Sequence, residues 1–193
     1  MAQIGVEPPG DGFWQFSLAF YASAGVAESL IDLQDRAGFD VNLILFALWL
    51  GLSGRRPLDA NGLAAAEAAV RAIRSGVVEP LRHMRRALKP HQELDLQELR
   101  ARIKELELAA EKAAQYRLAA IAGPVEAGFL PLPERLDRAG ANLALYLGSD
   151  QAGGAAARRL RLLLAEFAGS EPAARYSRAG STNRVGFRRA TRF

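Results

Sequence analysis

The feature that most constrains the fold is an uninterrupted apolar run of ten residues, from Leu43 to Leu52. A membrane-spanning helix needs about 20 consecutive apolar residues, so this run is too short to cross a bilayer and has to be buried in protein. A helix that is apolar on nearly all sides lies at the centre of a helical core. The sequence therefore predicts that residues 41–52 form a central helix around which the other helices pack.

Helix signals precede this run. Asp11 follows a Pro-Pro-Gly turn and is expected to cap a first helix that is rich in aromatic residues. A second helix is predicted over residues 26–37, where apolar residues recur every three or four positions. Gly38 stands where a left-handed C-terminal cap is expected, and Asp40 is expected to cap the central helix.

Two long amphipathic helices are predicted after the central run. The first contains Pro80, and proline inside a helix costs about 3 kcal/mol or forces a kink. We therefore expect a bend, or two abutting helices, at residues 75–80. The second is predicted from Glu93 to Gly123. The apolar residues expected to face the core are Leu63, Ala66, Val70, Ile73, Val77, Leu81, Met84 and Leu88 in the first, and Leu96, Leu99, Ile103, Leu106, Ala110 and Ala113 in the second.

The rest of the chain completes an all-α pattern. A proline-punctuated connector at residues 129–133 leads to a short helix containing Leu136 and Leu147, and a last helix is predicted over roughly residues 151–167. No segment shows the sustained alternation of a strand. The predicted fold is all-α, a single-domain bundle of about six or seven helices over residues 11–168, followed by a disordered Arg-rich tail over residues 169–193.

Composition narrows the classes of function. The chain has no cysteine and two histidines, which excludes thiolate chemistry and makes a multi-histidine metal site improbable. The net charge of +4 is concentrated at the C-terminus, where the last nineteen residues hold six arginines and no acid, so the other 174 residues carry −2. The sequence shows no signal peptide and no transmembrane segment, and we expect a cytoplasmic protein.

Polar residues beside the central helix form the first candidate site. Asp32 and Arg36 are four residues apart and are expected to pair on an exposed helix face. A cap accounts for Asp40, whereas Asn42, if buried, needs partners, and Gln34 or Ser17 are expected to supply them. The alternative is a cleft that holds a small ligand or a magnesium ion. The residues of this candidate cleft are Trp14, Gln34, Asp35, Asp40 and Asn42.

A basic helix face forms the second candidate. The members are Arg71, Arg74, Arg82, Arg85, Arg86 and Lys89, opposed by a single acid, Glu79. Such a face can bind phosphates, an acidic protein or an anionic membrane surface, although a charged helix face is most often only solvated. His83 adjoins it and is expected to be a surface residue. Arginines interleaved with aromatic residues in the tail also suit unspecific nucleic-acid contacts.

Catalytic motifs are missing from the sequence. It contains no glycine-rich phosphate loop, no His-Glu-x-x-His pair and no Gly-x-Ser-x-Gly turn, since Gly51-Leu52-Ser53-Gly54 has the wrong spacing. We therefore expect no resident cofactor or metal, and we lean towards a protein that is not an enzyme.

Several segments of the chain carry a recognisable pattern: Phe13-Trp14-x-Phe16-Ser17-Leu18-x-Phe20-Tyr21, Gly25-Val26, Leu33-Gln34-Asp35-x-x-Gly38-x-Asp40-Val41-Asn42-Leu43, Leu45-Phe46-x-Leu48-Trp49 and Val77-Val78-Glu79-Pro80-Leu81-Arg82-x-x-Arg85-Arg86-x-Leu88-Lys89. In these segments the chain resembles a bacterial, mostly proteobacterial, family of uncharacterised small proteins with a domain of unknown function. The resemblance covers roughly residues 11–147, and it implies an all-helical domain without implying an activity. Ser29 departs from the family, in which many members have cysteine, and the final helix and tail extend beyond it.

Three hypotheses for function follow from these patterns. The leading one is a non-enzymatic module that binds an unknown protein partner through the basic face of residues 71–89. The second is a small-ligand protein or magnesium enzyme with a cleft around Asp35, Asp40 and Asn42. The third is nucleic-acid association through the tail. The oligomeric state stays open, with two heptad-like helices leaving room for a dimer.

Overall fold

The structure is a computed structural model, and it describes residues 11–126 and 130–170. The described residues form helices and contain no β-strand, only one isolated bridge between Arg55 and Val125. The predicted all-α class is confirmed, and the predicted tail beyond residue 170 lies outside the described residues. The elements are α1 (Asp11–Tyr21), α2 (Val26–Ala37), α3 (Val41–Leu52), α4 (Ala60–Ile73), the π-helical turn η1 (Arg74–Val78), α5 (Glu79–Ala87), α6 (Leu94–Ile121), α7 (Leu132–Ala152) and α8 (Ala155–Ala168).

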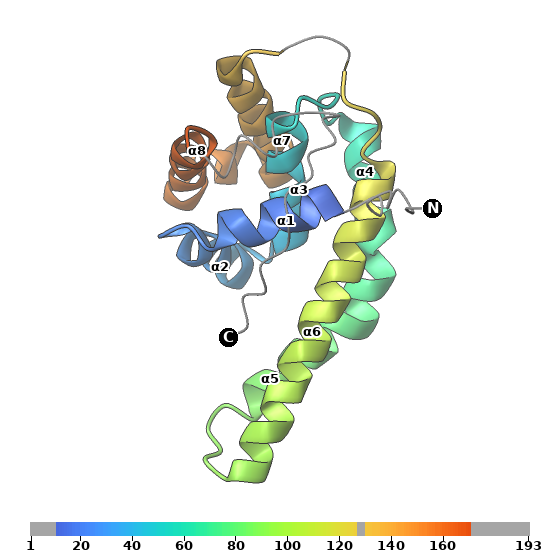
Figure 1. Cartoon of the computed structure of the whole chain (residues 1–193), viewed down its shortest axis with the longest axis vertical. Helices are drawn as coiled ribbons and strands as arrows, with labels where there is room; N and C mark the ends of the chain where they lie inside the picture. The colour runs from blue at the N-terminus through green and yellow to red at the C-terminus, as the bar shows by residue number, and fades with distance from the viewer. Residues whose placement is uncertain (1–10, 127–129, 171–193) are drawn as a thin grey trace, which may run out of the picture.

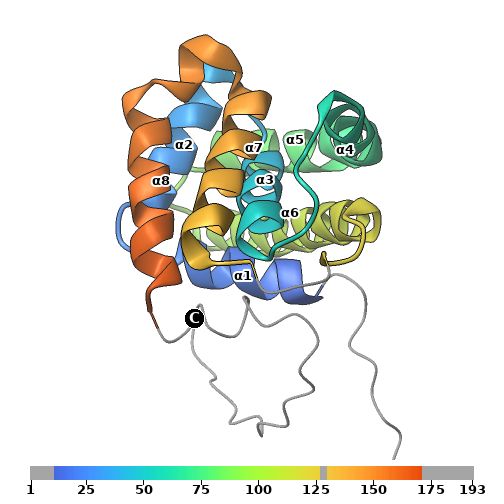
Figure 2. The same ribbon diagram turned by 90° about the horizontal axis from the view of Figure 1, so that it is seen from above.

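The helices divide into a head and an arm. Helices α1, α2, α3, α7 and α8 gather into the head, while α4, η1 and α5 run alongside the long α6 to form the arm (Figure 1). Seen from above, α3 lies between the α7–α8 pair and the arm (Figure 2). Ile44 and Leu48 of α3 are fully buried, which confirms the predicted central helix.

Helices α3 and α7 approach each other closely at Gly51. A Cβ atom added to Gly51 would lie 2.2 Å from the backbone nitrogen of Ala139, so only glycine allows the backbones to come this near. Asn142 of α7 is buried at the same contact and donates to the carbonyl oxygen of Ala47 at 3.1 Å. This packing fixes α3 within the head.

The junction between α2 and α3 has the predicted caps. Gly38 adopts a left-handed conformation with φ of 74°, and its N–H donates to the carbonyl oxygen of Gln34 at 3.1 Å. Two residues later, the Asp40 carboxylate accepts from the N–H of Asn42 at 2.8 Å and begins α3. The junction is therefore a short corner fixed by a glycine cap on one side and an aspartate cap on the other.

The C-terminal helices differ from their predicted bounds. The helix predicted to be short runs from Leu132 to Ala152, with non-helical dihedral angles at Gly148 (φ 75°). The last helix begins at Ala155, later than predicted, because Gly153 and Gly154 separate it from the end of α7. Local glycine chemistry thus sets both boundaries.

Where a bend or two abutting helices were expected at residues 75–80, the structure has a π-helical turn that separates α4 from α5. The N–H of Glu79 bonds to the carbonyl oxygen of Arg74, five residues earlier, just before Pro80 enters the first turn of α5. A π-turn holds one residue more than an α-turn, and each helical residue advances by about 100°. Side chains after η1 are therefore rotated by about 100° from where continuous α-helical spacing would place them.

This rotation corrects the predicted core face of the first long helix. Ala66 and Val70, before the π-turn, are fully buried as expected. Val77 and Met84 were expected to continue the same stripe, but they are 42% and 45% exposed. The rotation moves them out of the interface between α5 and α6.

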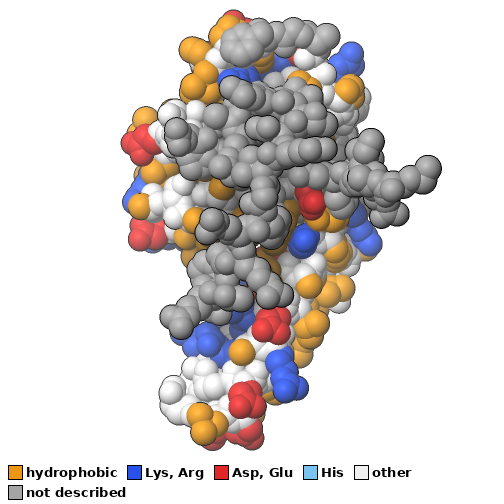
Figure 3. Space-filling view, viewed as in Figure 1, with side chains coloured by type: hydrophobic (Ala, Val, Ile, Leu, Met, Phe, Trp, Pro, Cys, Tyr) orange, Lys and Arg blue, Asp and Glu red, His pale blue; other side chains and the backbone are white. Residues whose placement is uncertain are grey.

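The corresponding residues of α6 are also exposed. Ile103 and Ala110 are buried as predicted, while Leu99 and Leu106 are 46% and 59% exposed. Figure 3 shows hydrophobic side chains at the surface along the arm. Each predicted stripe is therefore only partly used in the core.

No single helix in the described part of the chain has the length and apolarity needed to cross a membrane. Helices α1 and α2 meet that test only when they are taken together, across a bend of 101°.

Candidate ligand pocket

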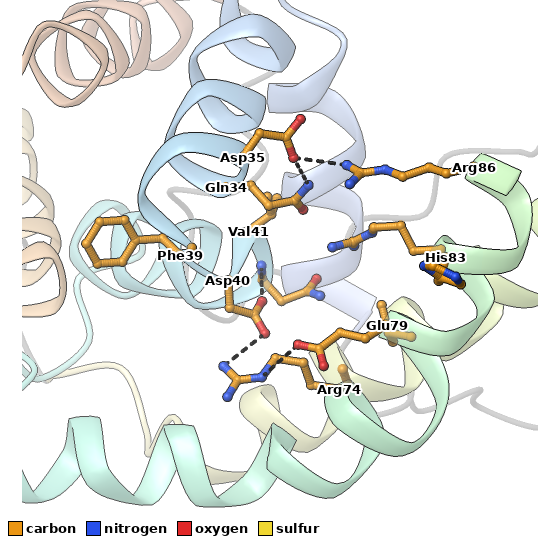
Figure 4. Close-up of a pocket in the computed structure, with 14 residues that line it drawn as sticks. Gln34, Asp35, Phe39, Asp40, Val41, Arg74, Glu79, His83 and Arg86 are labelled. Atoms are coloured by element: carbon orange, nitrogen blue, oxygen red, sulfur yellow. Dashed lines mark hydrogen bonds and ion pairs between the residues drawn. The ribbon is translucent and has the colours of Figure 1, made fainter. Parts of the chain in front are cut away.

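A pocket lies where the α2–α3 corner faces η1 and α5, and we call it the junction pocket. Its volume is about 470 Å³. Side chains from the head and from the arm point into it from opposite sides (Figure 4). The lining residues are Gln34, Asp35, Gly38, Phe39, Asp40, Val41, Asn42, Arg74, Val78, Glu79, Arg82, His83, Arg86 and Ala114.

Asp40 is held rigidly at the head side of the pocket. One carboxylate oxygen caps α3, and the backbone N–H of Asp40 donates to the hydroxyl of Tyr146 at 2.9 Å. Burial raises the pKa of Tyr146 to about 12, so this hydroxyl stays protonated at neutral pH. The second carboxylate oxygen of Asp40 has only a 3.7 Å ion-pair contact, with Arg74, and the side chain is 7% exposed. One acceptor thus remains available in the pocket.

The side chain of Asn42 is buried, and its hydrogen-bond partner lies on α6, not on α1 or α2 as expected. Its side-chain oxygen accepts from Gln115 of α6 at 2.8 Å. The expected partners were wrong, since Ser17 donates to the carbonyl oxygen of Phe13 and Gln34 donates to Asp35. The side-chain nitrogen of Asn42 (Nδ2) makes no hydrogen bond with any described residue, so it is an available donor in the pocket wall.

Arg74 faces Asp40 from the arm. Its Nη1 lies 3.7 Å from Asp40, and its Nε lies 3.8 Å from Glu79. Both distances exceed hydrogen-bond length, and Nε is buried without a hydrogen-bond partner. The guanidinium therefore lies between two carboxylates without donating to either (Figure 4).

A second ion pair joins head and arm at the pocket rim. Arg86 donates to Asp35 at 2.9 Å, and Gln34 donates to the same carboxylate oxygen at 3.1 Å. The hydrogen bonds from Gln34 and Arg86 lower the pKa of Asp35 below its ordinary value. Both charged side chains are about half exposed, so this pair is worth little in stability and can open to admit a ligand.

Behind the pocket lies a cluster of charged residues that we call the arginine–glutamate cluster: Arg82, Arg85, Glu107 and Glu111. Arg82 donates to Glu107 at 3.1 Å and to Glu111 at 2.9 Å. Arg85 donates to Glu107 twice, at 2.5 Å and 3.2 Å. Two arginines that the sequence placed on an exposed basic face are thus turned towards α6.

The pKa values of the two glutamates in the cluster are shifted in opposite directions. Desolvation raises the pKa of Glu107, but the hydrogen bonds from Arg85 and Arg82 outweigh it, and the net pKa is lowered. For Glu111, desolvation dominates the attraction of Arg82 and raises the pKa above its ordinary value. Glu107 is therefore the firmly ionised centre of the cluster.

The candidate residues from the sequence divide between the pocket and the rest of the surface. Gln34, Asp35, Asp40 and Asn42 line the junction pocket together with Arg74, Arg82 and Arg86 of the basic set. Trp14 does not line it, since the ring packs beneath Lys112, with 5.7 Å from Nζ to the ring centroid. Arg71 and Lys89 are exposed, outside the pocket, and form no ion pair with a described residue.

Sequence reasoning missed several residues that shape the site. Glu107, Glu111, Gln115 and Tyr146 lie 22 to 106 residues from the partners that they bond. A signal for the first two was present, because Glu107 and Glu111 are polar positions on α6 spaced four apart, opposite arginines spaced three apart. His83 is exposed, as expected, but it lines the pocket.

The acids of the site face arginines. Asp35 is paired with Arg86, and Asp40 lies 3.7 Å from Arg74. Among the residues that the structure describes, there is no group of three or more His, Asp or Glu side chains that could hold a metal ion. The magnesium alternative stays a prediction.

Comparison of the sequence with known proteins identifies a family whose activity is unknown. The family model described as "Protein of unknown function (DUF2390)" matches residues 12–118, which include α1 to α5 and most of α6. All of the pocket-lining residues lie within this match. Neither a search of curated proteins nor a search of solved structures found a match.

Proposed function

The chain belongs to this family of unknown function, and we propose that it binds a small polar molecule in the junction pocket. The observation that carries the proposal is the unused hydrogen-bonding capacity inside the pocket. Among the described residues, Nε of Arg74 is buried without a hydrogen-bond partner, and the side-chain nitrogen of Asn42 makes no hydrogen bond either. Buried polar groups are normally hydrogen-bonded, so groups left unpaired in a cleft indicate a ligand.

The size and rigidity of the pocket support this proposal. A volume of about 470 Å³ lies within the range of roughly 300–1,000 Å³ that is typical of small-molecule sites. Asp40 and Asn42 are fixed at the first turn of α3 by a cap and by a hydrogen bond to Gln115. A site built on such constrained side chains can bind without first ordering them.

We propose binding rather than catalysis because the lining lacks the usual nucleophiles. No serine, threonine, lysine or cysteine lines the pocket, and its one histidine, His83, has no acidic partner within ion-pair distance among the described residues. A serine, threonine or cysteine nucleophile is usually activated by an adjacent base of this kind, and the carboxylates of the pocket face arginines instead. The arrangement suits recognition of a polar ligand.

The junction pocket has more support than an exposed basic face that binds a protein partner. Such a face needs free cations, but Arg82 and Arg85 are paired with Glu107, and Arg86 is paired with Asp35. Pairing neutralises the field that would attract an acidic partner. Nucleic-acid association through the tail concerns residues outside the described part of the chain.

A thermal-shift screen of the full chain against small polar metabolites tests the proposal. We expect at least one compound to raise the melting temperature, because a ligand that binds only the folded state stabilises it. Arg74→Gln should abolish the shift, while Arg71→Gln, an exposed arginine three residues earlier, should leave it unchanged. A shift of equal size in both variants would contradict the proposed site, as would the lack of any shift.

A further inference from the structure

We infer that the ligand of the junction pocket is a small zwitterion that carries an amino group and a carboxylate, as a free α-amino acid does. This inference rests on the proposed function and names its class of ligand. It follows from which charged groups of the pocket are already hydrogen-bonded to one another and which are not.

The available donors select a carboxylate. Arg74 can offer its guanidinium in a planar, bidentate arrangement, and this geometry matches a carboxylate. Accepting such a group breaks no existing hydrogen bond, because the contacts of Arg74 with Asp40 and Glu79 are 3.7 Å and 3.8 Å long. The side-chain nitrogen of Asn42, on the α3 side of the pocket, is a further donor.

The available acceptors select a cation next to that carboxylate. One oxygen of Asp40 caps α3, and the other is free to accept from a ligand ammonium group. Glu79 lies on the other side of Arg74 and is 57% exposed, with no other ion pair among the described residues. A cation bound to Asp40 or Glu79 would lie next to the carboxylate bound to Arg74, because both acids are within 4 Å of that guanidinium.

The charge balance disfavours ligands of a single sign. Arg82 is hydrogen-bonded to Glu107 and Glu111, and Arg86 to Asp35, whereas Arg74 meets Asp40 and Glu79 only through ion-pair contacts of 3.7 Å and 3.8 Å. An anion bound to Arg74 alone would lie beside two carboxylates, whereas a cation alone would lie beside the guanidinium. Like charges at such short range destabilise binding. A zwitterion meets both signs favourably.

Isothermal titration calorimetry of the full chain with the common L-α-amino acids tests the inference. Each amino acid is compared with its N-acetyl derivative, which lacks the positive charge, and with its carboxamide, which lacks the negative charge. We expect at least one amino acid to bind and both blocked forms to bind about tenfold more weakly or worse, the effect of losing one charge-assisted hydrogen bond.

Two variants separate charge from structure. Asp40→Asn keeps a side-chain oxygen that caps α3 but removes the carboxylate, so it should weaken binding about tenfold or more while preserving the fold. Arg74→Gln should do the same, and Arg71→Gln should bind as the original chain does. Circular dichroism of each variant checks that the helices are retained, and the blocked amino acids decide the question if a variant fails to fold.

The outcomes distinguish this inference from the proposed function. If no amino acid binds, or if an N-acetyl derivative binds as tightly as its parent, the zwitterion is wrong. If another polar compound from the thermal-shift screen then binds in a way that depends on Arg74, the proposed function stands without it. If no compound binds at all, both are wrong.

Discussion

Replacing Glu107 with glutamine tests how α5 is held against α6. The Glu107 side chain is 8% exposed and accepts three hydrogen bonds from Arg82 and Arg85, at distances of 2.5 to 3.2 Å. Glutamine has almost the same shape but no charge, and its amide nitrogen would face guanidinium donors. The substitution therefore removes the ionic centre of the arginine–glutamate cluster with little change in packing volume.

The substitution is expected to lower the free energy of unfolding because it leaves two arginines without their main partner. Removing one partner of a buried ion pair costs about 3–5 kcal/mol. Arg82 and Arg85 are 20% and 26% exposed, and Arg82 keeps Glu111, so solvent and the remaining acid recover part of this cost. We expect Glu107→Gln to lower the free energy of unfolding by about 2–3 kcal/mol at pH 7.

Urea denaturation followed by circular dichroism measures this difference. Glu105→Gln is the matched control, because Glu105 lies on the same helix, is exposed, and forms no ion pair with a described residue. Surface substitutions of this kind change stability by about 0.5 kcal/mol or less. A loss in Glu107→Gln no larger than in Glu105→Gln would refute the role assigned to the cluster.

The same comparison has a defined pH dependence. Since the pKa of Glu107 is lowered in the folded chain, its contribution to stability is present above the ordinary glutamate pKa and is lost as the pH falls through the lowered value. The difference between the original chain and Glu107→Gln should therefore be constant near neutral pH and should shrink below about pH 4.5. A difference that grew with acidification would contradict the assignment.

Three further predictions follow from the packing. Because burial raises the pKa of Glu111, its charge is costly at neutral pH, and Glu111→Gln should leave the unfolding free energy at pH 7 unchanged or raise it in urea denaturation. The exposed half of the α6 stripe should tolerate truncation, so Leu106→Ala is expected to cost less than about 1 kcal/mol, whereas Ile103→Ala on the buried half should cost about 2–5 kcal/mol in the same assay. Gly51→Ala forces a Cβ against the backbone of Ala139 and should cost about 3 kcal/mol or more, seen as a fall of the melting temperature; an unchanged melting temperature would contradict the close contact.

Local chemistry made the corners of the fold predictable. Gly38 and Pro80 act through their own backbone preferences and Asp40 through its capping carboxylate, and each lies where the sequence predicted a cap or a break. The central helix was predictable for a related reason, since a run that is apolar on all sides has no exposed face to offer. These features depend on residues a few positions apart.

The rotation at η1 was not predictable from apolar spacing alone. Val77 and Met84 continue the three- and four-residue steps of α4, and nothing in that spacing reveals that one extra residue is taken up in a π-turn. The proline predicted a bend without specifying its form. As a result, the apolar stripe and the inward-facing arginines were both assigned to the wrong side of α5.

This rotation also affects how a basic-face experiment would be interpreted. Replacing Arg82 and Arg85 with glutamate would place acids against Glu107 and Glu111, and the arm would lose its ion pairs. Loss of a partner protein after such a change would report on folding as much as on recognition. Arg71 and Lys89 are the residues of that set whose exposure makes them suitable for a surface test.

The candidate pocket was predictable in its members but not in its assembly. Asp35, Asp40 and Asn42 attracted attention because they are polar beside an apolar helix, and Arg74 and Arg86 because they are basic. That the two groups face each other depends on tertiary packing of the arm on the head. No local pattern encodes that arrangement.

An NMR titration tests the central claim most directly. The full chain, labelled with ¹⁵N, would be titrated with mixtures of small polar metabolites while the backbone amide resonances are followed. We predict that at least one mixture shifts the resonances of Asn42, Arg74 and His83 and leaves that of Arg71 in place. Shifts confined to another surface, or no shift with any mixture, would contradict a ligand site at the junction of head and arm.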